Sequence, residues 1–172
     1  MKRLTNKNIK RGDVFSFVVA EGYSSVGVVV RSNIELYICV FREMVASTRL
    51  LALEIDELTP FLVGRTSDEK FFHGEWGLIG KSDYVPDVPF PCYVVETPDG
   101  LCLRDFDGNP LRPASQAERD FFGGMKTFSN IAFEKAIKSV HDIDFIGYDY
   151  SKISIEEAWR RVVDSAGHGF TA

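Results

Sequence analysis

A histidine and a glutamate stand two residues apart in the segment FFHGEWGLIG, at positions 71–80. An apolar run with glycines at intervals predicts a β-strand that bends or packs closely, and side chains two apart on a strand share a face. His73 and Glu75 would then form a pair suited to proton transfer or metal binding. A metal site needs further ligands, however, and the sequence contains neither HExxH nor paired CxxC. We therefore expect His73 to be structural or solvent-facing, with no metal and no cofactor.

An enzymatic alternative stays open, in which a hydrolase or nuclease uses His73, Glu75 and nearby carboxylates. The other histidines do not strengthen it, because His141 follows a helical run and His168 lies near the end of the chain. A histidine in the last turn of a helix complements the helix dipole without any catalytic role. The sequence also lacks GxSxG and any recognisable cysteine-nucleophile signature. The absence of these motifs favours a protein that is not an enzyme.

Two aromatic residues in the same region have different surroundings. Trp76 lies between glycines in the apolar run, which is typical of a core residue. Tyr84 instead lies in the segment KSDYVPDVPFP, whose prolines at 86–91 predict an extended loop. An aromatic side chain ringed by polar groups is typical of an interface hot spot. We expect Trp76 to be buried and Tyr84 to be exposed.

Charge along the chain is uneven, although the net value is only −5. Residues 1–12 carry five basic and no acidic groups, whereas residues 54–106 carry eleven acidic and four basic groups. The acidic bias disfavours nucleic acid as a ligand, because phosphates require cations, and it favours a basic partner. The residues that we expect to contact this partner are Asp68, Glu69, Asp83, Tyr84 and Asp87.

The elements that must position these side chains begin with a meander. Residues 14–19, 26–30 and 34–41 are rich in β-branched and aromatic residues, and short turns separate them. Connections this short require antiparallel pairing. A short helical turn at 44–53 and a strand at 61–63 follow. The sequence TPDG, at 97–100, has the order that a type I turn prefers and predicts a hairpin.

Helices are predicted towards the end of the chain. The segment SNIAFEKAIKSVHD has apolar residues at helical spacing after a capping residue, Ser129 or Asn130. In SKISIEEAWRRVVD, Ser154 and Glu157 have the spacing of a capping box.

Together these elements predict a single α+β domain over residues 1–172. We expect mainly antiparallel β-structure in a strongly bent sheet or partial barrel, with two or three helices mostly in the C-terminal third. Residues 1–10 should form a basic mobile arm and residues 167–172 a frayed tail.

The opening has no apolar stretch for a signal peptide, and no window suits a membrane span. The three cysteines have unrelated spacings. We expect a cytoplasmic protein with reduced thiols and no membrane association.

Several segments, in their order along the chain, resemble a bacterial family of immunity proteins. The GDVF sequence at 12–15 enters the first strand, Trp76, Ile79 and Gly80 fit a Trp-x-x-Ile-Gly pattern, and a TPDGL hairpin precedes an amphipathic helix. This combination is similar to the Immunity protein twenty-six family, which accompanies polymorphic and contact-dependent toxins. The similarity spans roughly residues 10–142.

The resemblance implies a mostly β fold and a non-enzymatic role, the binding and neutralisation of a cognate toxin C-terminal domain. It further implies a nuclease as the target, and nucleases hold phosphates on basic surfaces. An acidic inhibitor would occlude such a surface, with aromatic anchors supplying much of the affinity. An SH3-like adaptor that binds a peptide is a further alternative, because GDVF-like starts also occur in small β-barrels.

Overall fold

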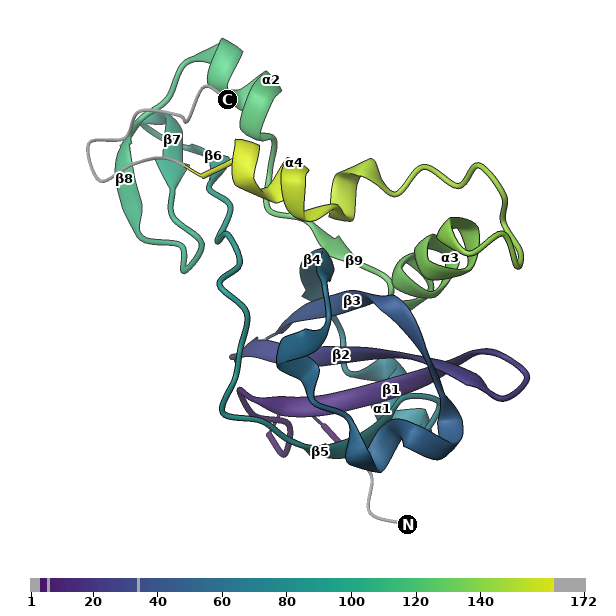
Figure 1. Cartoon of the computed structure of the whole chain (residues 1–172). Coiled ribbons are helices and arrows are strands. Elements are labelled where there is room, and N and C mark those ends of the chain that lie inside the picture. Colours follow the sequence, from purple (N-terminus) through teal and green to yellow (C-terminus); the bar gives the residue numbers. More distant parts are fainter. Residues whose placement is uncertain (1–3, 6, 34, 163–172) are drawn as a thin grey trace. The chain divides into compact units, whose positions relative to one another are not determined.

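The computed structural model describes residues 4–5, 7–33 and 35–162 (Figure 1). These residues form two compact units. Unit 1 comprises the described residues up to Asp87 together with Thr127–Ser154, and unit 2 comprises Val88–Lys126 together with the described residues from Ile155. Each unit has its own sheet, and the single domain expected over residues 1–172 stays a prediction.

The sheet of unit 1 has six strands in the order β5-β1-β2-β3-β4-β9. Their bounds are β1 (Asp13–Ala20), β2 (Tyr23–Ser32), β3 (Leu36–Ala46), β4 (Pro60–Thr66), β5 (Gly77–Lys81) and β9 (Thr127–Phe128). Neighbours pair antiparallel except β4 and β9, which are parallel. The predicted meander and the predicted strand at 61–63 are therefore confirmed, as part of a mainly antiparallel α+β fold.

The expected strongly bent sheet or partial barrel is wrong. The sheet is open, with β5 and β9 at its two edges, and neither sheet in the chain is strongly curled. Closure would require the edge strands to pair with each other, but β9 is only two residues long and pairs with β4. The bulges within β1, β2 and β3 bend the strands locally without closing them.

One face of this sheet carries the main core of unit 1. Phe15 and Phe17 point to this face of β1, and α1 (Glu69–His73) and α3 (Asn130–Val140) supply residues that cover it. Trp76 is fully buried there, stacked on Phe15 and on Phe17 with centroid distances of 5.0 Å in both cases. The predicted burial of Trp76 is confirmed. Ile9 is also fully buried in this core. Residues 1–3 and 6 of the expected arm, and residues 167–172 of the expected tail, lie outside the described residues.

The segment FFHGEWGLIG is not one continuous strand, and the prediction is wrong for its first half. Helix α1 ends at His73, Gly74 adopts a left-handed conformation with φ of 75°, and β5 begins only at Gly77. Gly74 and the residue after it donate backbone hydrogen bonds to the last turn, which ends the helix. The glycine spacing therefore marks a helix-to-strand turn.

The connection from β3 to β4 consists of two 3-10 helices, η1 (Ser47–Ala52) and η2 (Ile55–Glu57). The helical turn predicted at 44–53 is thus present from Ser47, whereas the preceding residues continue β3. A third 3-10 helix, η3 (Ser151–Ile153), lies near the end of unit 1.

Unit 2 contains a three-stranded antiparallel sheet in the order β6-β7-β8. The strands are β6 (Tyr93–Thr97), β7 (Gly100–Arg104) and β8 (Pro110–Pro113), so the hairpin predicted at 97–100 is confirmed. Two helices belong to this unit, α2 (Gln116–Phe122) and α4 (Ile155–Arg160). Helix α2 was not predicted from the sequence, although Ser115 and Glu118 form a complete capping box at its start. Helices α2, α3 and α4 all begin after residue 115, as expected for the C-terminal third.

Candidate functional site

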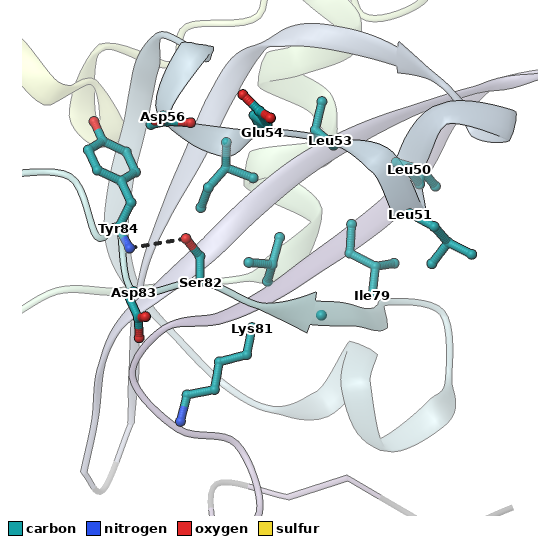
Figure 2. Close-up of a pocket in the computed structure, with 13 residues that line it drawn as sticks. Leu50, Leu51, Leu53, Glu54, Asp56, Ile79, Lys81, Ser82, Asp83 and Tyr84 are labelled. Carbon is teal, nitrogen blue, oxygen red and sulfur yellow. Dashed lines mark hydrogen bonds between the residues drawn. The ribbon is translucent and has the colours of Figure 1, made fainter.

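A groove of about 470 Å³ lies on unit 1, between η1 and η2 on one side and β5 with the residues after it on the other (Figure 2). We call it the η1–β5 groove. It is lined by Val14, Leu50, Leu51, Leu53, Glu54, Ile55, Asp56, Ile79, Gly80, Lys81, Ser82, Asp83 and Tyr84.

The wall formed by η1 is anchored at both ends and exposed between them. The Ser47 N–H donates a 2.9 Å hydrogen bond to the carbonyl oxygen of Gly22, and Ile55 is buried beyond the other end of η1. No residue of η1 itself is buried, although it contains two leucines, and Leu51 is 88% exposed. Leu50 is half-buried, so the exposed apolar surface of this wall is mainly that of Leu51.

The opposite wall depends on a register shift in the pairing of β1 with β5. Val14 pairs with Gly80 and Phe15 pairs with Leu78, so Ile79 is the extra residue of a bulge. Bulges redirect side chains locally. Leu78 packs against the main core, whereas Ile79 lines the groove.

The residues after β5 are held by backbone contacts with the start of β1. The Ser82 N–H donates a 2.9 Å hydrogen bond to the carbonyl oxygen of Gly12, and the Tyr84 N–H donates a 3.1 Å bond to the Ser82 hydroxyl. Gly12 has φ of +85°, and a Cβ atom at this position would lie 2.6 Å from the Ser82 carbonyl oxygen. Only glycine permits this approach, which fixes the loop that carries Tyr84.

The two ends of the groove differ in chemistry. Leu50, Leu51 and Ile79 form an apolar end, whereas Glu54, Asp56 and Tyr84 lie towards the other end (Figure 2). Lys81 and Asp83 also line the groove, and in Figure 2 the Lys81 side chain extends away from Glu54 and Asp56.

The two carboxylates of the acidic end are available to a ligand. Within the part of the chain that the structure describes, the side chains of Glu54 and Asp56 take part in no hydrogen bond or ion pair. The Tyr84 side chain is 39% exposed, so the prediction that it is accessible is confirmed. Two unpaired carboxylates beside an aromatic ring are suited to binding a cation.

The structure separates the residues that were expected to bind the partner. Asp83 and Tyr84 line the η1–β5 groove, whereas Asp68 and Glu69 lie at the start of α1 and Asp87 lies beyond the groove in an extended segment. The leucines of η1 and the carboxylates of Glu54 and Asp56 were not identified from the sequence. The signal was present in LLALEIDEL, at 50–58, where leucines precede and alternate with acidic residues without helical periodicity.

His73 and Glu75 do not form the expected pair on one strand face, because a left-handed Gly74 separates them. His73 is exposed at the end of α1, and Glu75 forms an ion pair with Lys70. The hydrogen bond to Glu75 raises the pKa of Lys70. Among the described residues, no group of three or more His, Cys, Asp or Glu side chains could hold a metal ion.

The groove is thus apolar at one end and acidic, with an aromatic ring, at the other. In the described part of the chain, no helix is long and apolar enough to cross a membrane. A comparison of the chain with protein-family models, curated proteins and solved structures finds no match.

Proposed function

We propose that this protein binds another protein through the η1–β5 groove, and that the partner is the basic C-terminal domain of a cognate bacterial toxin. The observation that carries the proposal is the exposed Leu51 beside the unpaired carboxylates of Glu54 and Asp56. An exposed apolar side chain next to uncompensated negative charge is suited to a partner that offers apolar and basic groups together. The choice of a toxin as partner is supported by the resemblance of the GDVF and Trp-x-x-Ile-Gly segments to immunity proteins.

On this proposal, the protein neutralises the toxin simply by covering the toxin's basic surface. A toxin that cleaves nucleic acid needs a basic surface to hold phosphates, and an inhibitor that covers this surface prevents substrate binding. Opposite charge accelerates the encounter, while buried apolar and aromatic anchors slow dissociation. A standard interface buries about 1,600 Å² in total, so the groove would form the centre of a larger contact.

We further propose that the protein belongs to the immunity-protein family that its motifs resemble. On this proposal it acts in the cytoplasm and works without catalysis or a cofactor. The net charge of −5 is consistent with a basic protein partner.

The test is protection of bacteria that produce the C-terminal domain of the toxin encoded next to this protein. Co-production of the wild-type chain should restore growth, and the two purified proteins should co-elute in gel filtration. The double variant Glu54→Lys with Asp56→Lys should lose protection, because it reverses the charge at the acidic end. The matched control is Glu21→Lys with Asp99→Lys, two exposed acidic residues outside the groove and its walls, which should protect like the wild type.

Two other variants separate the proposal from its rivals. Changing Asp68 and Glu69 together to lysine tests the start of α1, and loss of protection there alone would move the toxin-binding surface away from the groove. Replacing His73 and Glu75 together by alanine tests the enzymatic alternative, and we expect protection to be retained. A wild-type chain that neither protects cells nor binds the toxin domain would refute the proposal.

A further inference from the structure

The η1–β5 groove has a chemical polarity that restricts what can occupy it. Its apolar end is formed by Leu50, Leu51 and Ile79, and its acidic end includes Glu54 and Asp56 (Figure 2). A wholly apolar ligand would desolvate the carboxylates without compensation, and a wholly cationic one would leave the leucines exposed to water. The occupant must therefore carry a cation and an apolar group.

The acidic end favours a guanidinium group as that cation. Glu54 and Asp56 are free of ion pairs and hydrogen bonds among the described residues, and the ring of Tyr84 lies at the same end. A planar guanidinium has five N–H donors, so it can bond to more than one carboxylate oxygen while it stacks on an aromatic face. A lysine ammonium is more strongly hydrated and cannot stack in this way.

The exposure of the apolar end favours a polypeptide over a small molecule. A pocket for a small ligand commonly encloses most of that ligand's surface. The Leu51 side chain is instead 88% exposed at the rim of an open groove. Only an occupant that extends beyond the groove, such as a protein segment, can cover this side chain.

We infer that the η1–β5 groove recognises a segment of a partner protein in which an arginine lies within four residues of a large apolar side chain. The arginine occupies the acidic end, between the two carboxylates and Tyr84, and the apolar side chain packs on Leu50, Leu51 and Ile79. This inference rests on the proposed function, because it names the feature of the toxin that the groove would bind.

The experiment is a selection of random twelve-residue peptides, displayed on phage, against the purified full-length protein. We expect the enriched peptides to share an arginine one to four positions from Leu, Ile, Met or Phe. A synthetic peptide with the enriched motif should bind in fluorescence polarisation, and replacing its arginine by glutamate should weaken binding by about tenfold or more. Its replacement by lysine should give intermediate binding.

Variants of the protein locate the binding site. Glu54→Lys with Asp56→Lys should weaken peptide binding by about tenfold or more, and Leu51→Ser should also weaken it. The control pair Glu21→Lys with Asp99→Lys should bind like the wild type. Circular dichroism and thermal unfolding show whether each variant is folded.

Several outcomes would overturn the inference. These are no common motif, a motif without arginine, binding that the groove variants leave unchanged, or self-association of the protein through the groove in gel filtration. None of these outcomes bears on toxin protection, which the co-production assay measures separately. Retained protection with a failed peptide selection would refute only the assigned motif, whereas a failed protection assay with a positive selection would refute only the toxin as partner.

Discussion

The indole N–H of Trp76 donates a 2.8 Å hydrogen bond to Oε1 of Glu134, which joins the residue before β5 to helix α3. The ring itself is held between Phe15 and Phe17 by stacking. Lys70 Nζ lies 3.6 Å from the same Glu134 oxygen, so the carboxylate receives a second favourable contact. The tryptophan of FFHGEWGLIG is therefore a structural residue. The segment contributes to the groove only through its last residues, which belong to β5.

Removing this carboxylate should destabilise unit 1 measurably. In Glu134→Ala the buried indole N–H loses its acceptor, and we expect the free energy of unfolding to fall by about 1–3 kcal/mol. Glu134→Gln keeps an acceptor oxygen, so its free energy of unfolding should fall by less. Urea unfolding followed by far-ultraviolet circular dichroism measures the difference. Equal losses for alanine and glutamine would show that the hydrogen bond contributes little.

Gly27 should be intolerant of any side chain. A Cβ atom there would lie 2.3 Å from Phe15 Cζ and 2.8 Å from the Cys39 carbonyl oxygen. We expect Gly27→Ala to cost about 1–3 kcal/mol through overpacking, and to alter Trp76 fluorescence because Phe15 must move. Gly77→Ala is the matched control, since a Cβ atom at that position would have no neighbour within 4 Å among the described residues. An unfolding midpoint of Gly27→Ala equal to that of the control would contradict the close packing.

The three cysteines should differ in reactivity in the folded protein. Burial raises the pKa of the Cys39 thiol to about 12, an effect that a hydrogen bond with the backbone of Phe61 opposes in part. The thiolate is the reactive form, so we expect Cys39 to resist iodoacetamide at pH 8 until urea unfolds the chain. Cys102 is only half-buried and should be modified first. Peptide mapping by mass spectrometry assigns the sites, and rapid native modification of Cys39 would contradict its burial.

Leu51 should be important for binding and unimportant for folding. Its side chain has little contact to lose, so Leu51→Ser should change the free energy of unfolding by no more than about 0.5 kcal/mol. On the proposed function, binding of the toxin domain should weaken by about tenfold, because the variant loses the apolar area that Leu51 would bury in the complex. Val18→Ser is a control at another exposed apolar position outside the groove. Calorimetric titration gives the affinities, and equal effects at both positions would argue against the groove.

The sequence predicted elements whose signal is local. The meander, the hairpin at 97–100 and helix α3 follow from β-branched runs, turn residues and helical spacing, and all are present. Helix α1 was missed because its five residues are too few to show helical periodicity. Helix α2 was missed although its capping box, Ser115 with Glu118, is visible in the sequence.

The groove could not be predicted in the same way. Leu51 and Ile79 are far apart in the sequence, and their proximity depends on the pairing of β1 with β5 and on the path of η1. The acidic bias of residues 54–106 led to the choice of Asp83, and the exposed aromatic position led to the choice of Tyr84; both line the groove, and their role in binding stays a prediction. The sequence did not show that Glu54 and Asp56 lack partners among the described residues, because pairing is a tertiary property.

The stability of unit 2 should depend on pH through Glu118. Hydrogen bonds from Arg112 and from the backbone and hydroxyl of Ser115 lower the pKa of Glu118 from 4.5 to about 2. A carboxyl with a lowered pKa in the folded state stabilises that state fully above its unfolded pKa. This contribution is therefore present above about pH 4.5 and is lost as the pH falls towards 2.

Glu118→Gln should abolish this dependence, because the amide does not titrate. We expect the variant to be less stable than the wild type at pH 7, with the difference shrinking between pH 4.5 and pH 2. Amide hydrogen exchange in β6, β7 and α2 reports on the stability of this unit directly. Comparing the variant with the wild type at each pH cancels the contributions of other carboxyl groups. A stability difference that stays constant over this range would show that the pKa of Glu118 is not lowered in the folded protein.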